Sequence, residues 1–393
     1  MKNKLLMMIY SLLLGSLIGT IIWLFLKITN LGIELIWNTV PDHFNIPFYT
    51  IIICLLGGII IGLWKKRTGD YPDSLHDVTE NLKKGDKYPY NNVGTISVSS
   101  MLPLLFGASV GPEAGLSNII VGLCSWISNK FKFMYSEIKE LTRIGMSATL
   151  GTIFNSPLFG FAMPIESEGI GIPKRHKVVL YFLAIFGALG AVMLLKHFFG
   201  GGTNLLSFKG YVATYKEWLL LVPLSLIGVV FGIIFLSFDK LTKKISSLFG
   251  ENILLKCIIA GLILGILGTL FPLAMFSGEL QMEQVANTYK NIGIVTLLLL
   301  AVVKLFLTNT CINLGLKGGE FFPCILAGIC LGFAFGLLFN INLIFSVCIL
   351  TTSLLAYVIK KPVATVLLLM ICFPVAAIPA MLVASAIGGF SKK

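Results

Sequence analysis

The sequence has few charged residues. Asp, Glu, Lys and Arg make up 12% of its 393 residues, about half of the roughly 25% that is usual in soluble domains, and the mean hydropathy is +0.91. A bilayer is therefore the expected solvent, and no residues are left over for a soluble domain. Apolar stretches long enough to cross about 30 Å of hydrocarbon occur at residues 4–28, 47–64, 178–199, 217–237, 253–276, 291–310 and 324–349. The composition predicts an all-α polytopic membrane protein.

The first apolar stretch lacks a small-residue cleavage site, so it is predicted to remain in the protein as a span. The second stretch ends in Lys65, Lys66 and Arg67. Because cytoplasmic loops are rich in basic residues, we expect a multi-pass protein of the cell membrane with a cytoplasmic N-terminus. Similar clusters in short loops account for the net charge of +12. Nucleic-acid binding, which needs a solvated basic face, is not expected.

The spacing of a metal site or of a disulfide framework is also missing. The eight cysteines are scattered singly, mostly inside apolar runs, and the four histidines include no pair that could bind a metal from one helix face. The cysteines are therefore expected to be small apolar packing residues. We expect neither a metal nor a cofactor.

Two breaks rich in glycine and proline interrupt the apolar pattern. They are Gly107–Pro112, which lies between apolar pieces too short to cross comfortably, and Gly315–Pro323. Unwound backbone at membrane depth is tolerated only where it is buried in protein or lines a cavity. Such interruptions at corresponding places in two halves therefore indicate a transport site, although each break alone is equally typical of a kink or a tight packing site.

The spacing of these breaks indicates an internal duplication. Pro112 and Pro323 are separated by nearly the same length of chain as Pro157 and Pro362, which open two later apolar runs. We therefore expect a single transmembrane domain, residues 1–393, with a first repeat in 1–200 that includes the N-terminal helix and a second in 201–393. No cytoplasmic regulatory domain is expected.

Both breaks suit an anion. A helix N-terminus presents unpaired N–H groups and about half a positive charge, so it can bind an anion without a cationic side chain. Glycine lets the backbone approach the ion, and proline is tolerated in the first turn. Gly111–Pro112 and Gly318–Gly319 followed by Pro323 meet this description.

At these motifs the sequence resembles the CLC family of chloride channels and chloride/proton antiporters, over about residues 60–390. The segments that carry the resemblance are GASVGPEAG at 107–115, NSPLFGFAMPIE at 155–166, GGEFFP at 318–323 and, later, 354–370. The resemblance implies an inverted-repeat helical fold whose broken half-helices meet at the bilayer midplane, and a homodimer with one pore per subunit. It also implies anion-binding or pore residues: Ser109, Val110, Gly111, Pro112, Gly318, Gly319, Glu320, Phe321, Phe322 and Pro323.

The departures from the family pattern concern proton coupling. Val110 stands where the family has its gating glutamate, and Ser167 stands where the antiporters have an inner proton-transfer glutamate, although Glu166 is kept. We therefore expect passive conduction of chloride or a related small anion, and no enzymatic reaction. Glu113 is a possible relocated gate, because it would share a face with Val110 if both were helical. Alternatively, Glu113 satisfies the N-terminal N–H groups of its own helix.

The inner end of the predicted pore departs further. Gly69, Asp70, Tyr71 and Pro72 occupy the place of the family's first motif and lack its serine hydroxyl. We also expect that the protein lacks the family's later helix with a pore-facing tyrosine. Selectivity for fluoride or another anion therefore stays open.

Two rival functions remain. A chloride/proton antiporter would use Glu113 with Glu166 or Glu168 in place of the lost acids. More remotely, residues 107–111 fit the G-x-S-x-G pattern of a serine hydrolase. That function needs a base within hydrogen-bond reach of Ser109, and no histidine is placed to supply one.

Overall fold

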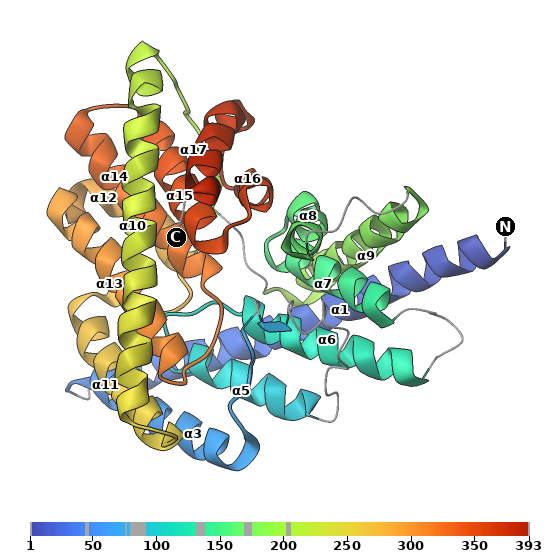
Figure 1. Ribbon diagram of the computed structural model, residues 1–393. Helices are drawn as coiled ribbons and strands as arrows, with labels where there is room; N and C mark the ends of the chain where they lie inside the picture. Colours follow the sequence, from blue (N-terminus) through green and yellow to red (C-terminus); the bar gives the residue numbers. More distant parts are fainter. Residues whose placement is uncertain are drawn as a thin grey trace. The chain divides into compact units, whose positions relative to one another are not determined.

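The computed structural model describes residues 2–43, 47–74, 77–78, 92–130, 138–168, 175–201 and 206–391. Within this part of the chain the regular structure is helical and includes no named strand (Figure 1). The chain forms two compact units. Unit 1 comprises Met1–Leu35, Tyr71–Met101 and Pro112–Thr203, and unit 2 comprises Ile36–Asp70, Leu102–Gly111 and Asn204–Lys393.

Unit 1 is a bundle in which α1 and α9 pack side by side and α7 contacts α1, α6, α8 and α9. Small residues line much of these interfaces, as is usual where transmembrane helices approach closely. Its helices are α1 (Lys2–Glu34), α6 (Glu113–Lys130), α7 (Ile138–Ile153), α8 (Pro157–Glu168), α9 (Arg175–Phe199) and the first part of α5 (Val93–Leu105).

Unit 2 has α14 (Phe321–Phe339) near its centre, packed between α13 (Ile294–Asn313) and α15 (Leu343–Ile359). Nearly every side chain of α14 and α15 is buried, so these helices form the core of the unit. Around them lie α3 (Tyr49–Thr68), α10 (Tyr215–Leu248), α11 (Ile253–Leu270), α12 (Glu279–Ile292), α16 (Pro362–Leu369) and α17 (Ile378–Phe390), with the short α2 (Val40–His43) at the start of the unit.

Seven helices among the described residues are long and apolar enough to cross a membrane, as expected of an integral membrane protein, and one of them lies near the N-terminus. Two of the predicted apolar spans were wrong in their extent. The apolar stretch 324–349 is not one span, because Asn340 adopts a left-handed conformation that ends α14, and the Asn342 side chain accepts a hydrogen bond from the Phe345 N–H to start α15. Similarly, the stretch 253–276 is not one helix, because α11 ends at Leu270 and a short 3-10 helix follows at Pro272–Ala274. The orientation of the protein in the cell membrane stays a prediction.

The predicted division into repeats 1–200 and 201–393 also stays a prediction. The two compact units follow a different, interleaved pattern, because residues 36–70 and 102–111 belong to the same unit as residues 204–393. Helix α5 illustrates this, since its last turn from Leu102 belongs to unit 2.

Candidate functional site

The first predicted break, Gly107–Pro112, is non-helical, and the second is non-helical from Gly315 to Glu320, since Phe321–Pro323 already belong to α14; the two breaks pair with each other in unit 2. Helix α5 ends at Leu105 and α13 ends at Asn313, and each is followed by a short irregular segment. Where these segments meet, the Gly111 N–H donates to the Gly319 carbonyl oxygen at 2.8 Å, and the Gly319 N–H donates to the Gly111 carbonyl oxygen at 2.7 Å. We call this pair the glycine bridge. It satisfies two backbone donors and two acceptors that would otherwise be costly in hydrocarbon.

Close packing beside the glycine bridge requires a residue without a side chain at position 318. A Cβ atom added to Gly318 would contact the side chain of Val110, with its Cβ only 2.6 Å away, and would lie 2.9 Å from the Gly111 carbonyl oxygen. Val110 is itself fully buried in a tight turn, where its N–H donates to the Ala108 carbonyl oxygen at 2.8 Å. The glycine bridge therefore has no space for a methyl group at this point.

The helix that follows the second break begins directly after the glycine bridge. Glu320 is the N-cap residue of α14, Phe321 is its first residue, and Pro323 lies in its first turn. The first four N–H groups of a helix have no partner within the helix, and the helix dipole adds about half a positive charge there. Phe321, Phe322 and Pro323 are buried, so this positive end is shielded from bulk water.

A buried lysine, Lys304, connects α13 to the first break. Its side chain is 0% exposed, and its ammonium donates to the carbonyl oxygens of Ala274 at 3.1 Å, Met275 at 3.3 Å and Phe276 at 2.6 Å. The Phe276 N–H in turn donates to the Gly107 carbonyl oxygen at 3.0 Å. A lysine inside an apolar span is a signal of function, but the sequence did not reveal that three carbonyl oxygens would be its partners.

Ser109 is held in the same region by a hydroxyl group. Its Oγ lies 3.3 Å from Thr308 Oγ1, and because Thr308 donates its hydroxyl proton to the Lys304 carbonyl oxygen at 2.8 Å, it accepts from Ser109. A threonine hydroxyl is not a base, so this contact gives no support to the serine hydrolase. His43 binds the Thr39 carbonyl oxygen instead, while His76 and the side chain of His176 lie outside the described residues.

In unit 1, α6 begins at Glu113, directly after Pro112. Val110 lies outside this helix, so the condition under which Val110 and Glu113 would share a helical face is not met. Proline at the helix start explains the difference, because it favours the first turn and marks where α6 begins. The Glu113 side chain is 1% exposed, so a titratable group is buried at the N-terminus of α6.

Asn118 in α6 forms two hydrogen bonds with the backbone next to the predicted inner pore. The sequence did not indicate this role. Asn118 Nδ2 donates to the Asp73 carbonyl oxygen at 2.9 Å, and its Oδ1 accepts from the Asp73 N–H at 3.2 Å. The segment next to Asp73 contains Tyr71, whose hydroxyl accepts from Asn92 at 3.1 Å, and Pro72, which is buried. Asn118 was detectable only as a polar residue inside an apolar helix.

The remaining predicted residues lie in different surroundings. Glu166 and Ser167 are near the end of α8, where Glu166 is half-buried and the Ser167 hydroxyl lies 3.7 Å from Met163 Sδ. The side chain of Glu168 lies outside the described residues. In unit 2, Gly69 ends α3 with a positive φ of 102°, and Asp70 forms ion pairs with Lys65 and Lys317. The roles of these residues stay predictions.

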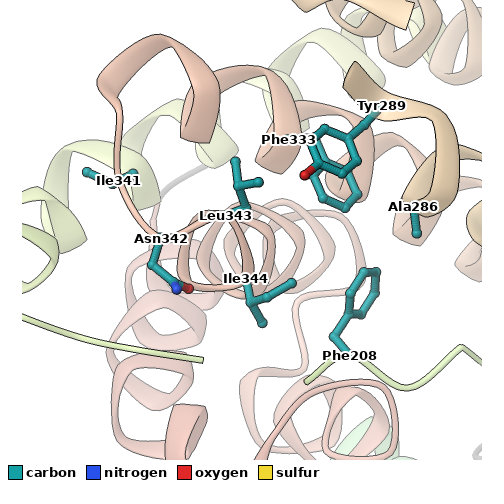
Figure 2. Close-up of a pocket in the computed structure, with 8 residues that line it drawn as sticks. All are labelled: Phe208, Ala286, Tyr289, Phe333, Ile341, Asn342, Leu343 and Ile344. Carbon is teal, nitrogen blue, oxygen red and sulfur yellow. The ribbon is translucent and has the colours of Figure 1, made fainter. Parts of the chain in front are cut away.

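Unit 2 also contains a cavity of about 450 Å³ that the sequence did not indicate (Figure 2). Tyr289 and Phe333 stack at one side of it, with ring centroids 4.5 Å apart. Its lining is largely apolar and includes none of the predicted pore residues: it consists of Phe208, Ala286, Tyr289, Phe333, Ile341, Asn342, Leu343 and Ile344. The cavity therefore adds no side chain to the predicted pore around the glycine bridge.

Comparison with known proteins gives relatives that are named for ion transport. The YfeO protein of Salmonella choleraesuis (strain SC-B67), which is named for ion transport, is 23% identical over 347 residues, which are 84% of this chain and 80% of that protein. The YfeO protein of Escherichia fergusonii is 25% identical over 350 residues, 84% of this chain and 79% of that protein.

Solved structures share the fold. The crystal structure of a CLC-type fluoride/proton antiporter matches with a TM-score of 0.80 at 21% identity, covering 98% of this chain and 94% of that one. A slow cyanobacterial Cl⁻/H⁺ antiporter matches with a TM-score of 0.79 at 20% identity, covering 97% and 94%.

The sequence profile of the voltage gated chloride channel family matches residues 52–392, which is most of the chain. The chain therefore belongs to the voltage gated chloride channel family, as the resemblance of its motifs predicted, and this membership supports a function in anion transport.

Proposed function

We propose that this protein conducts chloride or a related small anion passively, along a path beside the glycine bridge and the N-terminus of α14. The observation that carries this proposal is the pairing of Gly111 with Gly319 immediately before Phe321. This arrangement leaves irregular backbone and the positive end of a helix together inside an apolar protein. Peptide dipoles can hold an anion with partial charges, weakly enough for it to leave again.

The absence of proton coupling is inferred from Val110. This buried side chain precedes Gly111 and carries no titratable group, so it can neither bind a proton nor compete with the anion for the helix end. A carboxylate at this place would do both. Uncoupled conduction therefore follows most directly from the residue that is present, and the proposal includes no enzymatic reaction.

Assembly and orientation complete the proposal. Family membership supports a homodimer with one anion path per subunit. The basic residues Lys65, Lys66 and Arg67 in the last turn of α3 support a cytoplasmic location for that end of the helix, and hence for the N-terminus.

Reconstituted liposomes test the proposal. Vesicles that contain the purified protein and a chloride gradient, with a potassium ionophore to balance charge, are expected to release chloride without taking up protons. A chloride electrode and an external pH electrode measure both movements in one sample, and protein-free vesicles are the control. Proton uptake in a fixed ratio to chloride would contradict passive conduction.

Proton-coupled exchange is the second candidate, because Glu113 is a buried carboxylate at the start of α6 and the structurally similar proteins are antiporters. If Glu113 is the proton site, Glu113→Gln abolishes proton uptake while anion movement continues. If Glu113 only accepts hydrogen bonds from the N-terminal N–H groups of α6, the same variant leaves the anion flux and its pH dependence unchanged.

A further inference from the structure

Unit 2 contains an ion cluster at the end of α3, formed by Lys65, Asp70 and Lys317. Lys65 Nζ lies 2.7 Å from Asp70 Oδ1, and Lys317 Nζ lies 2.8 Å from Asp70 Oδ2. Lys317 also donates to the backbone carbonyl oxygen of Asp70 at 2.9 Å. Each carboxylate oxygen thus has its own ammonium partner, and the carboxylate is an anion held between two cations.

Backbone geometry explains how these groups meet. Gly69 ends α3, and its N–H donates to the Lys65 carbonyl oxygen at 2.9 Å. Its φ of 102° turns the chain sharply, which brings Asp70 back to Lys65 in the preceding turn. Lys317 arrives from the segment after α13 and immediately precedes Gly318. The cluster is therefore connected directly to the glycine bridge.

The three side chains differ in their access to water. That of Lys65 is 0% exposed, that of Lys317 is 27% exposed and that of Asp70 is 50% exposed. A buried ammonium without a negative partner costs several kcal/mol, so Lys65 needs an anion beside it. The side chain of Asp70 is half open to water, so solvent and dissolved ions can reach the carboxylate that neutralises Lys65. A small anion from solution can take its place and still neutralise Lys65.

The charge balance of the cluster favours an anion. Two ammonium groups, those of Lys65 and Lys317, face one carboxylate, that of Asp70. Burial alone would raise the pKa of Asp70, but the charges and hydrogen bonds of Lys65 and Lys317 outweigh it and lower the pKa below its usual value. Asp70 is therefore ionised at neutral pH, and the cluster as a whole stays positive.

We propose that Lys65 and Lys317 form an additional binding site for a small anion, and that Asp70 is a tethered occupant which a permeant anion displaces. The proposal rests on the proposed function and extends it, because Lys317 places this site next to Gly318. It gives the path a site made of side-chain cations, distinct from the backbone groups at the glycine bridge. Exchange between Asp70 and the anion would then limit the rate at which an anion enters the path.

Thermal unfolding of the full-length protein in detergent tests this proposal, with sodium chloride compared with sodium gluconate at equal ionic strength. Asp70→Asn removes the competing carboxylate. We expect a lower melting temperature than the wild type in gluconate, because Lys65 loses its partner, and a larger increase on adding chloride. If Asp70 fills the site about nine-tenths of the time, the apparent chloride affinity rises about tenfold when it is removed.

Two further variants keep the test decisive. Lys317→Gln added to Asp70→Asn is expected to abolish the gain in chloride affinity. Asp239→Asn is the comparison variant, because Asp239 also pairs with a lysine, Lys243, at 2.7 Å, but that lysine side chain is 63% exposed and does not need a negative partner. It should respond to chloride as the wild type does.

A chloride-dependent increase no larger in Asp70→Asn than in the wild type would overturn the proposal. If Asp70→Asn does not fold, Lys317→Gln alone decides: its chloride-dependent increase should be smaller than that of the wild type, and an equal increase refutes the site. Because this measurement needs no transmembrane gradient, its failure is separate from a failure of wild-type vesicles to pass chloride.

Discussion

Gly318→Ala is expected to lower the chloride flux of the reconstituted protein by about tenfold or more. The added methyl group would collide with the Val110 side chain and press on the Gly111 carbonyl oxygen, so the glycine bridge must open or shift. Overpacking of this kind typically costs about 1–3 kcal/mol. A rise of about 1.4 kcal/mol in the barrier for passage already corresponds to a tenfold lower rate. Chloride efflux per protein, measured in vesicles, gives the result.

The structure offers both a control and a rescue for this variant. Gly190→Ala is the control, because nothing lies within 4 Å of a Cβ atom added to Gly190 in the middle of α9. It should conduct normally. Val110→Gly combined with Gly318→Ala removes the main obstacle and should restore part of the flux. If Gly318→Ala conducts as well as Gly190→Ala, the close packing beside the glycine bridge has no part in conduction.

Lys304→Met is expected to destabilise the protein by about 3 kcal/mol or more. Methionine fills a similar volume but cannot donate to the carbonyl oxygens of Ala274, Met275 and Phe276, which would remain buried without this donor. Each buried polar group left unsatisfied costs about 1–3 kcal/mol. Because Phe276 holds the Gly107 carbonyl oxygen, the flux should fall as well. The melting temperature in detergent and the chloride efflux are the two measurements.

Lys216→Met is a matched control for this prediction. The ammonium of Lys216 also donates to backbone carbonyl oxygens, those of Phe339 at 3.0 Å and Asn340 at 2.9 Å, but the side chain is exposed. Water can replace these bonds, so the change should have little effect. Equal melting temperatures for the two variants would contradict the role assigned to the buried lysine.

The transmembrane helices and both breaks could be predicted from the sequence because each depends on local composition. Apolar runs of sufficient length define the spans, and glycine with proline defines the interruptions. The end of α14 at Asn340 was missed although its signals are also local, since Asn340 can adopt a left-handed conformation and Asn342 can cap the next helix. The apolar residues on both sides concealed a two-residue boundary.

The contacts within the candidate site could not be predicted because they join distant segments through backbone atoms. The pairing of Gly111 with Gly319 leaves no side-chain signature, and neither does the choice of carbonyl oxygens by Lys304. The ion pair between Asp70 and Lys317 likewise depends on two turns that are far apart in the sequence. A sequence pattern identifies residues with unusual chemistry at membrane depth, but the fold decides which of them meet.

The interleaving of the two units bears on how the protein is made. Unit 2 takes residues 36–70 and 102–111 from the early part of the chain, and all its other residues from 204 onward. During synthesis, α3 and the segment that ends at Gly111 must therefore enter the bilayer long before their partners leave the ribosome. Gly111 has no Gly319 to bind until most of the chain has been translated, so the central hydrogen bonds of the site cannot form early in synthesis.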